Sequence, residues 1–358
     1  MMKNLIYLLP LLLLFSCREK SVTTITVAGF PSTIELEAKT LETDTAILAP
    51  SEMFILNDQL WILQSRNNPL FWVYSLDKGN FLYSTGYKGH SSNEFIHPGF
   101  MTIQLINEHT FTMLDNSFLK TIEVSKDGIL NVLKTESIFD LRPINGFVRL
   151  NDSLYCAFAD CATGTESDFE YRIKNQNTNK ESKFSEYPVL FNFEEKGDER
   201  CQLYYKYLVA NAKENKFAAF YGYFNYIRIF KDLELEKEIF IEAIPFKADR
   251  ENRKNYYKKP YSSEEFIYAP CFSDKIQVWD WEGQPIALLT LEHSFFRFTI
   301  DEKRQKLYTI SLGEENENKI MITNIIDRFL FNNFIYFLPY SKDYYIDYLF
   351  AEININIL

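Results

Sequence analysis

The stretch Phe71-Trp72-Val73-Tyr74-Ser75-Leu76-Asp77-Lys78-Gly79 is the clearest indication of the fold, because it joins an apolar strand to a tight charged turn and recurs along the chain. The same pattern returns at residues 121–128 and 276–283. Short runs of aromatic and β-branched residues that end in a turn rich in Asp, Lys and Gly predict strands. No long stretch shows the 3.6-residue periodicity of an amphipathic helix. The repeat therefore predicts an all-β chain built from many short strands.

Further apolar runs give the number of repeats. Six of them, most preceded by a polar turn, are spaced 41 to 63 residues apart: residues 60–63, 111–114, 154–158, 217–220, 266–269 and 307–310. A period near 50 residues with several strands per repeat is typical of a β-propeller blade. Six units predict a six-bladed β-propeller over residues 42–324, and a closed ring would protect the edges of about 24 short strands. Because the chain has only 12 Gly, we expect Asn and Asp to occupy many turns.

One loop carries a resemblance to a known family. The segment Gly86-Tyr87-Lys88-Gly89-His90-Ser91-Ser92-Asn93-Glu94-Phe95, followed by Pro98, resembles the G-x-K-G-x-G-P-x-E-F loop of TolB-like six-bladed propeller lipoproteins of Bacteroidetes. Gly86, Lys88, Gly89, Glu94 and Phe95 match, whereas Ser91 and Ser92 replace the usual Gly-Pro. The resemblance covers roughly residues 45–324. It implies the fold and a lipoprotein localisation, but the family has no established catalytic residues to transfer.

The same loop has two chemical interpretations. Its backbone N–H groups could cradle an anion, or the loop could be an inter-blade turn in which Gly86 and Gly89 supply unusual dihedrals and Glu94 accepts backbone hydrogen bonds. The second is favoured, because no helical pattern follows Phe95. His90 and His97, with Glu94 between them, could ligate a metal, but their spacing fits neither a helix face nor a strand face. We expect no metal site and no cofactor.

The N-terminus predicts where the protein is located. Residues 5–15 form an apolar run too short to span a bilayer but of the length of a signal-peptide core. The following Leu14-Phe15-Ser16-Cys17 resembles a bacterial lipobox. We expect residues 1–16 to be a lipoprotein signal peptide, Cys17 to carry the lipid, and residues 17–41 to form an N-terminal segment before the propeller. These features predict an outer-membrane lipoprotein that faces the periplasm or the cell surface. The alternative is an ordinary cleaved signal peptide with a chance cysteine.

The composition of the chain restricts the kinds of partner that the protein can bind. The net charge of −11 and the pI near 5.1 argue against nucleic-acid binding, which needs clustered Lys and Arg. Aromatic residues reach 16%, which fits either a β-rich core or a carbohydrate-stacking surface, and the core is favoured. Besides Cys17, the chain has Cys156, Cys161, Cys201 and Cys271. We expect free thiols, although an extracytoplasmic compartment also permits disulfides, and the absence of a CxxC pair gives little support for a structural zinc site.

The end of the chain departs from the repeat. Residues 325–358 are rich in Phe and Tyr, carry few charges and show no clean blade pattern. They could supply strands that close the ring. Alternatively, the reading frame changes near Asn324 and produces a tail that was never selected to pack.

A basic cluster stands out against this acidic chain. Residues 247–261 interleave cations with tyrosines: Lys247, Arg250, Arg253, Lys254, Tyr256, Tyr257, Lys258, Lys259 and Tyr261. Such a loop could bind an acidic glycan or a partner protein, with tyrosine rings for stacking and Arg for carboxylates. The alternative is a solvated inter-blade loop that offsets nearby carboxylates.

The sequence supports binding better than catalysis. No G-x-S-x-G elbow occurs, and four His residues offer few bases for a catalytic triad. We therefore predict a lipid-anchored envelope propeller that acts as a non-catalytic binding or scaffolding module for a glycan or partner protein. The alternative is a metal-dependent propeller hydrolase or lyase that acts on a glycan or lactone. The residues that line the central channel should distinguish the binding module from the enzyme.

Overall fold

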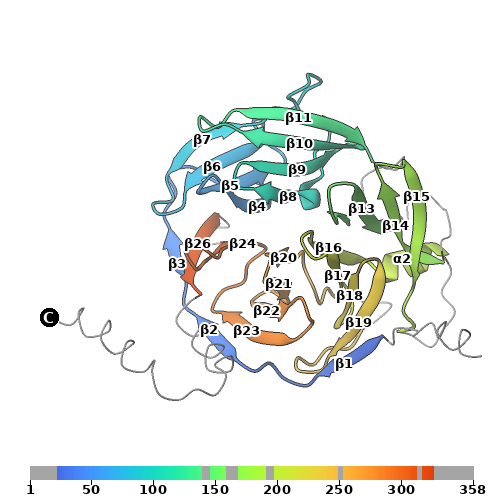
Figure 1. Ribbon diagram of the computed structural model, residues 1–358. Coiled ribbons are helices and arrows are strands. Elements are labelled where there is room, and N and C mark those ends of the chain that lie inside the picture. The colour runs from blue at the N-terminus through green and yellow to red at the C-terminus, as the bar shows by residue number, and fades with distance from the viewer. Residues whose placement is uncertain are drawn as a thin grey trace, which may run out of the picture.

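The computed structural model shows six β-sheets arranged as blades around a central axis, which confirms the six-bladed propeller (Figure 1). Each blade starts with its innermost strand, and we number the blades in chain order. The structure describes residues 22–138, 146–158, 168–190, 197–248, 253–312 and 317–325.

Blades 1 to 3 are four-stranded antiparallel sheets of consecutive strands. Blade 1 contains β4 (Pro50–Leu56), β5 (Gln59–Gln64), β6 (Phe71–Ser75) and β7 (Phe81–Thr85). After the 3-10 helix η2 (Phe100–Thr102), blade 2 contains β8 (Gln104–Asn107), β9 (Thr110–Asp115), β10 (Phe118–Val124) and β11 (Leu130–Ser137). Blade 3 contains β12 (Phe147–Arg149), β13 (Leu154–Phe158), β14 (Phe169–Asn175) and β15 (Lys180–Glu186).

Blades 4 to 6 complete the ring. The helix α2 (Gly197–Leu203) precedes blade 4, which contains β16 (Lys206–Asn211), β17 (Lys216–Tyr221), β18 (Tyr226–Lys231) and β19 (Glu234–Ile241). Blade 5 contains β20 (Tyr261–Ser262), β21 (Phe266–Cys271), β22 (Lys275–Asp280) and β23 (Pro285–Leu291). Blade 6 contains only three consecutive strands, β24 (Arg297–Asp301), β25 (Lys306–Leu312) and β26 (Asn318–Asn324).

Three N-terminal strands lie along the outside of blades 4, 5 and 6 (Figure 1). β1 (Thr23–Val27) pairs parallel to β19, and β2 (Thr33–Leu36) pairs parallel to β23. β3 (Lys39–Leu41) pairs antiparallel with β26 and is the fourth strand of blade 6. The sequence assigned residues 17–41 to a segment before the propeller, but the three strands within this segment pair with the sheets of blades 4, 5 and 6.

The N-terminal strand β3 fills the position at which the sequence offered residues 325–358 as possible ring-closing strands. Ile325 is buried against blades 5 and 6, and residues 326–358 lie outside the described residues. The structure therefore leaves the frame-change hypothesis as a prediction.

Each of the six apolar runs found in the sequence is the second strand of a blade: β5, β9, β13, β17, β21 or β25. These strands are sandwiched between neighbouring blades and are almost fully buried. Their aromatic residues pack between blades, as where the ring of Phe217 in blade 4 lies edge-on to that of Tyr171 in blade 3, with ring centroids 5.5 Å apart. The high aromatic content therefore fills the core to a large extent.

The turns follow the expectation for Asn and Asp. Asn57, Asp58, Asn116, Asn179 and Asn215 all have positive φ angles of 51–59°. Where the turn after the third strand ends in Gly, the glycine has a φ near +75°, as at Gly128 and Gly283. The left-handed conformation costs Asn, Asp and Gly less than other residues.

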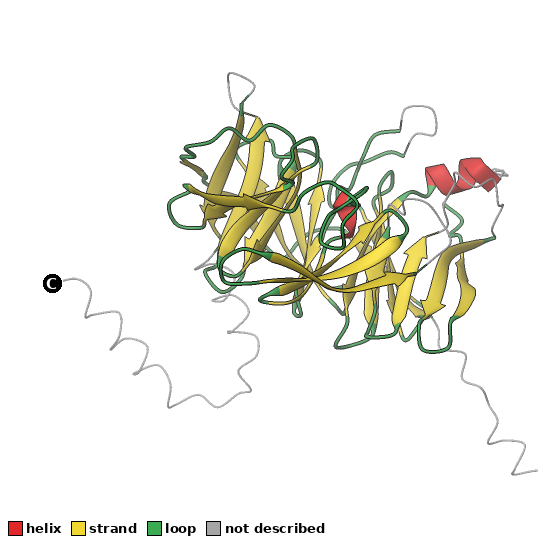
Figure 2. Cartoon of the chain, turned by 90° about the horizontal axis from the view of Figure 1, so that it is seen from above, coloured by secondary structure: helices red, strands yellow, loops and turns green. Residues whose placement is uncertain are grey.

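The two faces of the ring differ in their connections. On one face, which we call the long-loop face, the chain passes from the outer strand of one blade to the inner strand of the next, over residues 86–103, 187–205 and 242–260 among others. The opposite short-turn face carries tight turns such as residues 57–58 and 232–233. Figure 2 shows α2 at the upper right, on the long-loop side. Because every inner strand starts at the long-loop face, the N-terminal ends of all six inner strands gather there.

Candidate functional site

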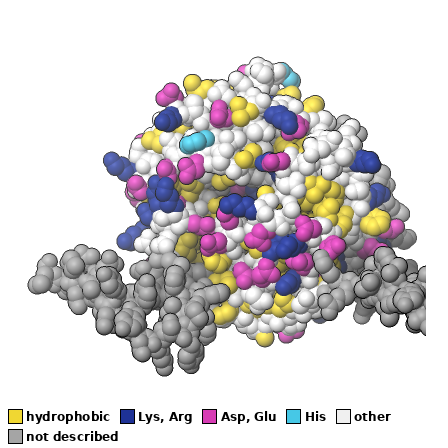
Figure 3. Space-filling view, viewed as in Figure 1, with side chains coloured by type: hydrophobic (Ala, Val, Ile, Leu, Met, Phe, Trp, Pro, Cys, Tyr) yellow, Lys and Arg dark blue, Asp and Glu magenta, His cyan; other side chains and the backbone are white. Residues whose placement is uncertain are grey.

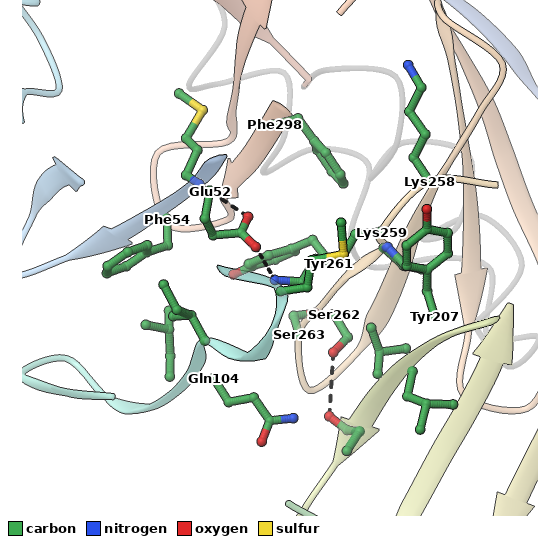
Figure 4. Close-up of a pocket in the computed structure, with 18 of the residues that line it drawn as sticks. Glu52, Phe54, Gln104, Tyr207, Lys258, Lys259, Tyr261, Ser262, Ser263 and Phe298 are labelled. Atoms are coloured by element: carbon green, nitrogen blue, oxygen red, sulfur yellow. Dashed lines mark hydrogen bonds and ion pairs between the residues drawn. The ribbon is translucent and has the colours of Figure 1, made fainter. Parts of the chain in front are cut away.

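The central channel contains a cavity of about 590 Å³, to which the innermost strands of all six blades contribute. This volume lies within the range of small-ligand sites. Apolar and aromatic side chains, including Phe54, Tyr207, Tyr261 and Phe298, alternate with polar groups such as Gln104 (Figure 4). Burial raises the pKa of both Tyr207 and Tyr261 above the ordinary tyrosine value, so both hydroxyls are protonated at neutral pH and can donate hydrogen bonds.

The described lining has more cations than carboxylates. Arg149, Lys213, Lys258, Lys259 and Arg297 face the cavity, together with Glu52 and Glu264. Three of the five cations have carboxylate partners: Arg149 pairs with Asp152, Lys213 pairs with Glu264, and Lys259 pairs with Glu52. Within the described residues, Lys258 and Arg297 form no ion pair and bond only to backbone carbonyls.

The ion pair of Lys259 with Glu52 crosses the channel, because Lys259 precedes blade 5 and Glu52 belongs to blade 1. Figure 4 shows the pair in the middle of the cavity, with the side chain of Lys258 pointing away from it. A second cross-channel contact joins the Tyr205 hydroxyl, before blade 4, to the Met101 sulfur, before blade 2, over 3.9 Å. Both contacts lie near the starts of inner strands, at the end of the channel toward the long-loop face.

The residues of the predicted basic cluster do not lie together in the structure. Lys258 and Lys259 reach the central cavity. Arg253 and Lys254 lie outside it and are exposed, and Arg253 Nη1 is 3.5 Å from Gln202 Oε1. Arg250 lies outside the described residues.

Tyr256 and Tyr257, in contrast, are fully buried between blades 4 and 5. Tyr257 donates a hydrogen bond of 2.8 Å to Gln277 Oε1, and Gln277 Nε2 donates one of 3.0 Å to the Tyr256 hydroxyl. Their rings are therefore not accessible to a ligand at the surface. The cavity instead presents Tyr207 and Tyr261 as aromatic side chains.

The loop at residues 86–95 has the geometry of an inter-blade turn. Gly86 has a φ of +74° and packs against Phe71, and Phe95 is fully buried. Gly89 N donates to Phe95 O (3.0 Å), Ser91 N donates to the Glu94 carboxylate (3.0 Å), and Lys88 Nζ donates to Ser65 O (2.8 Å). The hydrogen bonds from Ser91 lower the pKa of Glu94. These internal bonds use loop amides that an anion cradle would need.

A buried charge cluster was not foreseen from the sequence. The carboxylate of Glu170 in β14 contacts Lys206 Nζ, accepts from the Tyr221 hydroxyl at 2.7 Å, and accepts from Arg228 Nη1 at 3.0 Å. All four residues are almost completely buried and connect blade 3 with blade 4. Burial lowers the pKa of Lys206 to about 8, against the opposing attraction of Glu170. Arg228 also pairs with Glu238 at 2.7 Å, so two carboxylates balance the two cations and the cluster is a structural connection between blades.

The cysteines are in mixed states. Cys156 and Cys271 are free and buried, and burial raises the pKa of Cys271 to about 12 and that of Cys156 further. Cys201 is disulfide-bonded, so the expectation of free thiols is wrong for this residue. Cys17 and Cys161 lie outside the described residues. Within the described ranges, no group of three or more His, Cys, Asp and Glu side chains is placed to hold a metal ion.

Comparisons with known proteins identify the fold. No family model matches the sequence, and no curated protein matches it. Among solved structures, a candidate exported protein of Bacteroides fragilis NCTC 9343 superposes with a TM-score of 0.52 at 13% identity, covering 85% of this chain and 99% of that one. A member of the DUF4221 family from Bacteroides vulgatus ATCC 8482 gives a TM-score of 0.54 at 12% identity, covering 82% and 96%. At these identities the likeness supports the propeller fold alone. In the described part of the chain, no helix is long and apolar enough to cross a membrane.

Proposed function

We propose that this protein is a lipid-anchored binding module of the cell envelope, and that a glycan chain end enters its central cavity from the long-loop face. One observation carries the proposal: all six inner strands contribute to one cavity of about 590 Å³, in which tyrosine side chains alternate with hydrogen-bonding groups. Sugars are recognised by such a combination of apolar ring faces and oriented polar groups. A cavity of this volume suits a chain end better than the surface of a folded partner.

Localisation belongs to the same proposal. The lipobox-like residues 14–17 would place diacylglycerol on Cys17 and tether the propeller to the outer membrane. A diacyl unit and an N-acyl chain together provide enough buried hydrocarbon for stable anchoring. The two solved structures named above come from Bacteroides, and one is described as a candidate exported protein, which agrees with a position outside the cytoplasm.

The hydrolase alternative has less support from the lining. Its two described carboxylates, Glu52 and Glu264, are each held by a lysine. The Lys259–Glu52 pair is partly buried and the Lys213–Glu264 pair is largely exposed, and neither assigns its carboxylate to acid–base chemistry. Binding is therefore the function that the lining supports best.

A variant that narrows the cavity tests this proposal. Ala210 lies in β16 and lines the cavity, so Ala210→Phe should fill part of it. Thr135→Phe, on the exposed outer strand β11, is the matched control. On an array of neutral and acidic glycans, the parent and Thr135→Phe should give the same signal, and Ala210→Phe should lose at least tenfold. A parent without signal, or an Ala210→Phe variant that binds like the parent at unchanged melting temperature, would contradict the proposal.

A further inference from the structure

Lys258 and Arg297 are two cations that line the cavity close to the starts of the inner strands β20 and β24. Lys258 Nζ donates to Phe295 O at 2.8 Å, and Arg297 Nη1 donates to Phe296 O at 2.7 Å, so two successive carbonyl groups hold the two cations. Arg297 also donates from Nε to Ser51 O at 2.5 Å, which fixes its guanidinium against blade 1. Both side chains line the cavity and are partly buried.

These bonds leave donors unused. A lysine ammonium has three N–H donors and an arginine guanidinium has five. The structure gives one protein acceptor to Lys258 Nζ and two to Arg297. The remaining N–H groups can serve an acceptor within the cavity, and a carboxylate or a sulfate ester can receive two parallel bonds from arginine.

The charge balance of the described lining favours an anion. Five cations and two carboxylates face the cavity, and the two carboxylates are already paired with Lys259 and Lys213. The negative charge of Asp274 favours the charged form of Lys258, but Asp274 already forms an ion pair with Lys275 at 3.1 Å. Figure 3 shows that Lys and Arg are interspersed with Asp and Glu over one face of the molecule. The cavity is thus a local positive focus on a chain whose net charge is −11.

The positive charges of Lys258 and Arg297 repel each other, and this repulsion suggests that the two residues bind an anion. Burial, and next the positive charge of Arg297, lower the pKa of Lys258. Holding two cations together in a partly buried place destabilises the protein unless a counter-charge lies between them. An anionic group of a ligand would remove this repulsion when it binds.

We propose that Lys258 and Arg297 form an anion-binding subsite, so that the ligand of the central cavity ends in an acidic sugar, with a carboxylate or a sulfate ester held between the two cations. This inference rests on the proposed function and specifies its ligand. Lys259 and Glu52, which neutralise each other across the channel, would lie beside the sugar ring and contact its hydroxyl groups.

The test compares three disaccharides of one backbone, whose terminal glucose is unmodified, oxidised to glucuronic acid, or sulfated at the 6-position. Calorimetric titration of the parent at pH 7 and low salt should show at least tenfold tighter binding of one acidic form than of the neutral form. Comparison of the glucuronic acid and 6-sulfate disaccharides shows whether the subsite prefers a carboxylate or a sulfate ester. The preference should shrink with added salt, because partly exposed charge pairs are screened.

Variants at Lys258 identify the subsite. Lys258→Gln should reduce the acidic preference by about tenfold, whereas Lys258→Arg should retain it. Lys254→Gln, on the same loop but outside the cavity, is the matched control and should bind like the parent. Arg297 is left unchanged because it also holds blade 1.

The outcomes separate the two proposals. Equal binding of neutral and acidic disaccharides, lost in Ala210→Phe, would overturn the anion subsite and leave the cavity as a glycan site. An acidic preference that survives in Lys258→Gln but disappears in Lys254→Gln would place the anion outside the cavity and would also overturn the subsite. Failure of all three disaccharides to bind would contradict both proposals.

Discussion

Glu170 shows how much a single buried charge can contribute to the contact between two blades. Its carboxylate has no exposed surface and lies among Lys206, Arg228 and the Tyr221 hydroxyl. The ring of Tyr221 is also 4.7 Å from Lys206 Nζ. Without Glu170, Arg228 would keep its ion pair with Glu238 at 2.7 Å, but Lys206 would lose its carboxylate partner. A buried cation left in this way is far more costly than the loss of one exposed ion pair.

We expect Glu170→Gln to lower the free energy of unfolding by about 3 kcal/mol, the usual cost of breaking a buried ion pair. The double variant Glu170→Gln/Lys206→Met should recover part of this loss, because it removes the cation that the first substitution leaves without a carboxylate partner. Urea denaturation would measure both effects. Glu181→Gln, which breaks the partly exposed pair with Arg172, is the control and should cost below about 1 kcal/mol. A similar cost for Glu170→Gln and Glu181→Gln would refute this role for Glu170.

Local turns could be predicted from the sequence, but contacts between distant residues could not. The positive-φ turns at Asn57 and Asn215 follow from local chemistry and were foreseen. The neighbours of Glu170 are 36 and 58 positions away, at Lys206 and Arg228, so their contact depends on how blades 3 and 4 pack. A local motif cannot reveal a cluster of this kind.

Elements were predictable where they are long and apolar. The second strands of all blades are continuous buried runs, and each was recognised as a repeat unit. β1, β2 and β3 were not recognised, because they contain only three to five residues and pair with strands more than 200 positions away. The cavity was missed as a site for a similar reason, because each blade supplies only a few lining residues and none forms a contiguous motif. The basic cluster pointed to it only through Lys258 and Lys259.

The strand β3 joins the N-terminal segment to the last blade, and its removal should have a specific effect. Leu41 pairs with Ile320 and is buried with Tyr74 and Ile310 at the contact between blades 1 and 6. Deleting residues 22–36 should leave a monomer with a lower melting temperature, because it removes only the outer strands β1 and β2. Deleting residues 22–41 should also expose the edge of β26 and the buried side chains beside it, and an exposed edge strand promotes aggregation.

Size-exclusion chromatography and thermal melts of the two deletion variants would check this expectation. The shorter deletion is the control for loss of chain and of apolar burial in general. If the longer deletion gives a monomer with the same melting temperature as the shorter one, β3 does not close the ring in solution.

For the whole molecule, the strand directions specify which face would lie nearest the membrane. β1 runs parallel to β19, which starts at the short-turn face, so the chain enters the propeller from that side. Ile325, at the other end of the described chain, donates from its backbone N–H to Gln305 O in a turn on the same face, at 3.0 Å. If Cys17 carries the lipid, the residues between it and Val22 can span at most about 20 Å. The short-turn face should then lie toward the bilayer, and the long-loop face with the cationic end of the cavity should point away from it.

Fluorophores attached on the two faces would test this orientation. Lys126→Cys places a label in a tight turn of the short-turn face, and Ser92→Cys places one in the loop between blades 1 and 2 on the long-loop face; both native residues are exposed. In vesicles that carry the lipidated protein and quencher-labelled headgroups, the label at position 126 should be quenched at least twice as strongly as the label at position 92. The Cys17→Ala protein, which lacks the proposed anchor, should stay in the soluble fraction or remain unprocessed, and its labels should not be quenched. Stronger quenching at position 92 would show that the cavity faces the membrane and that a ligand from the surrounding medium has to approach from the side of the bilayer.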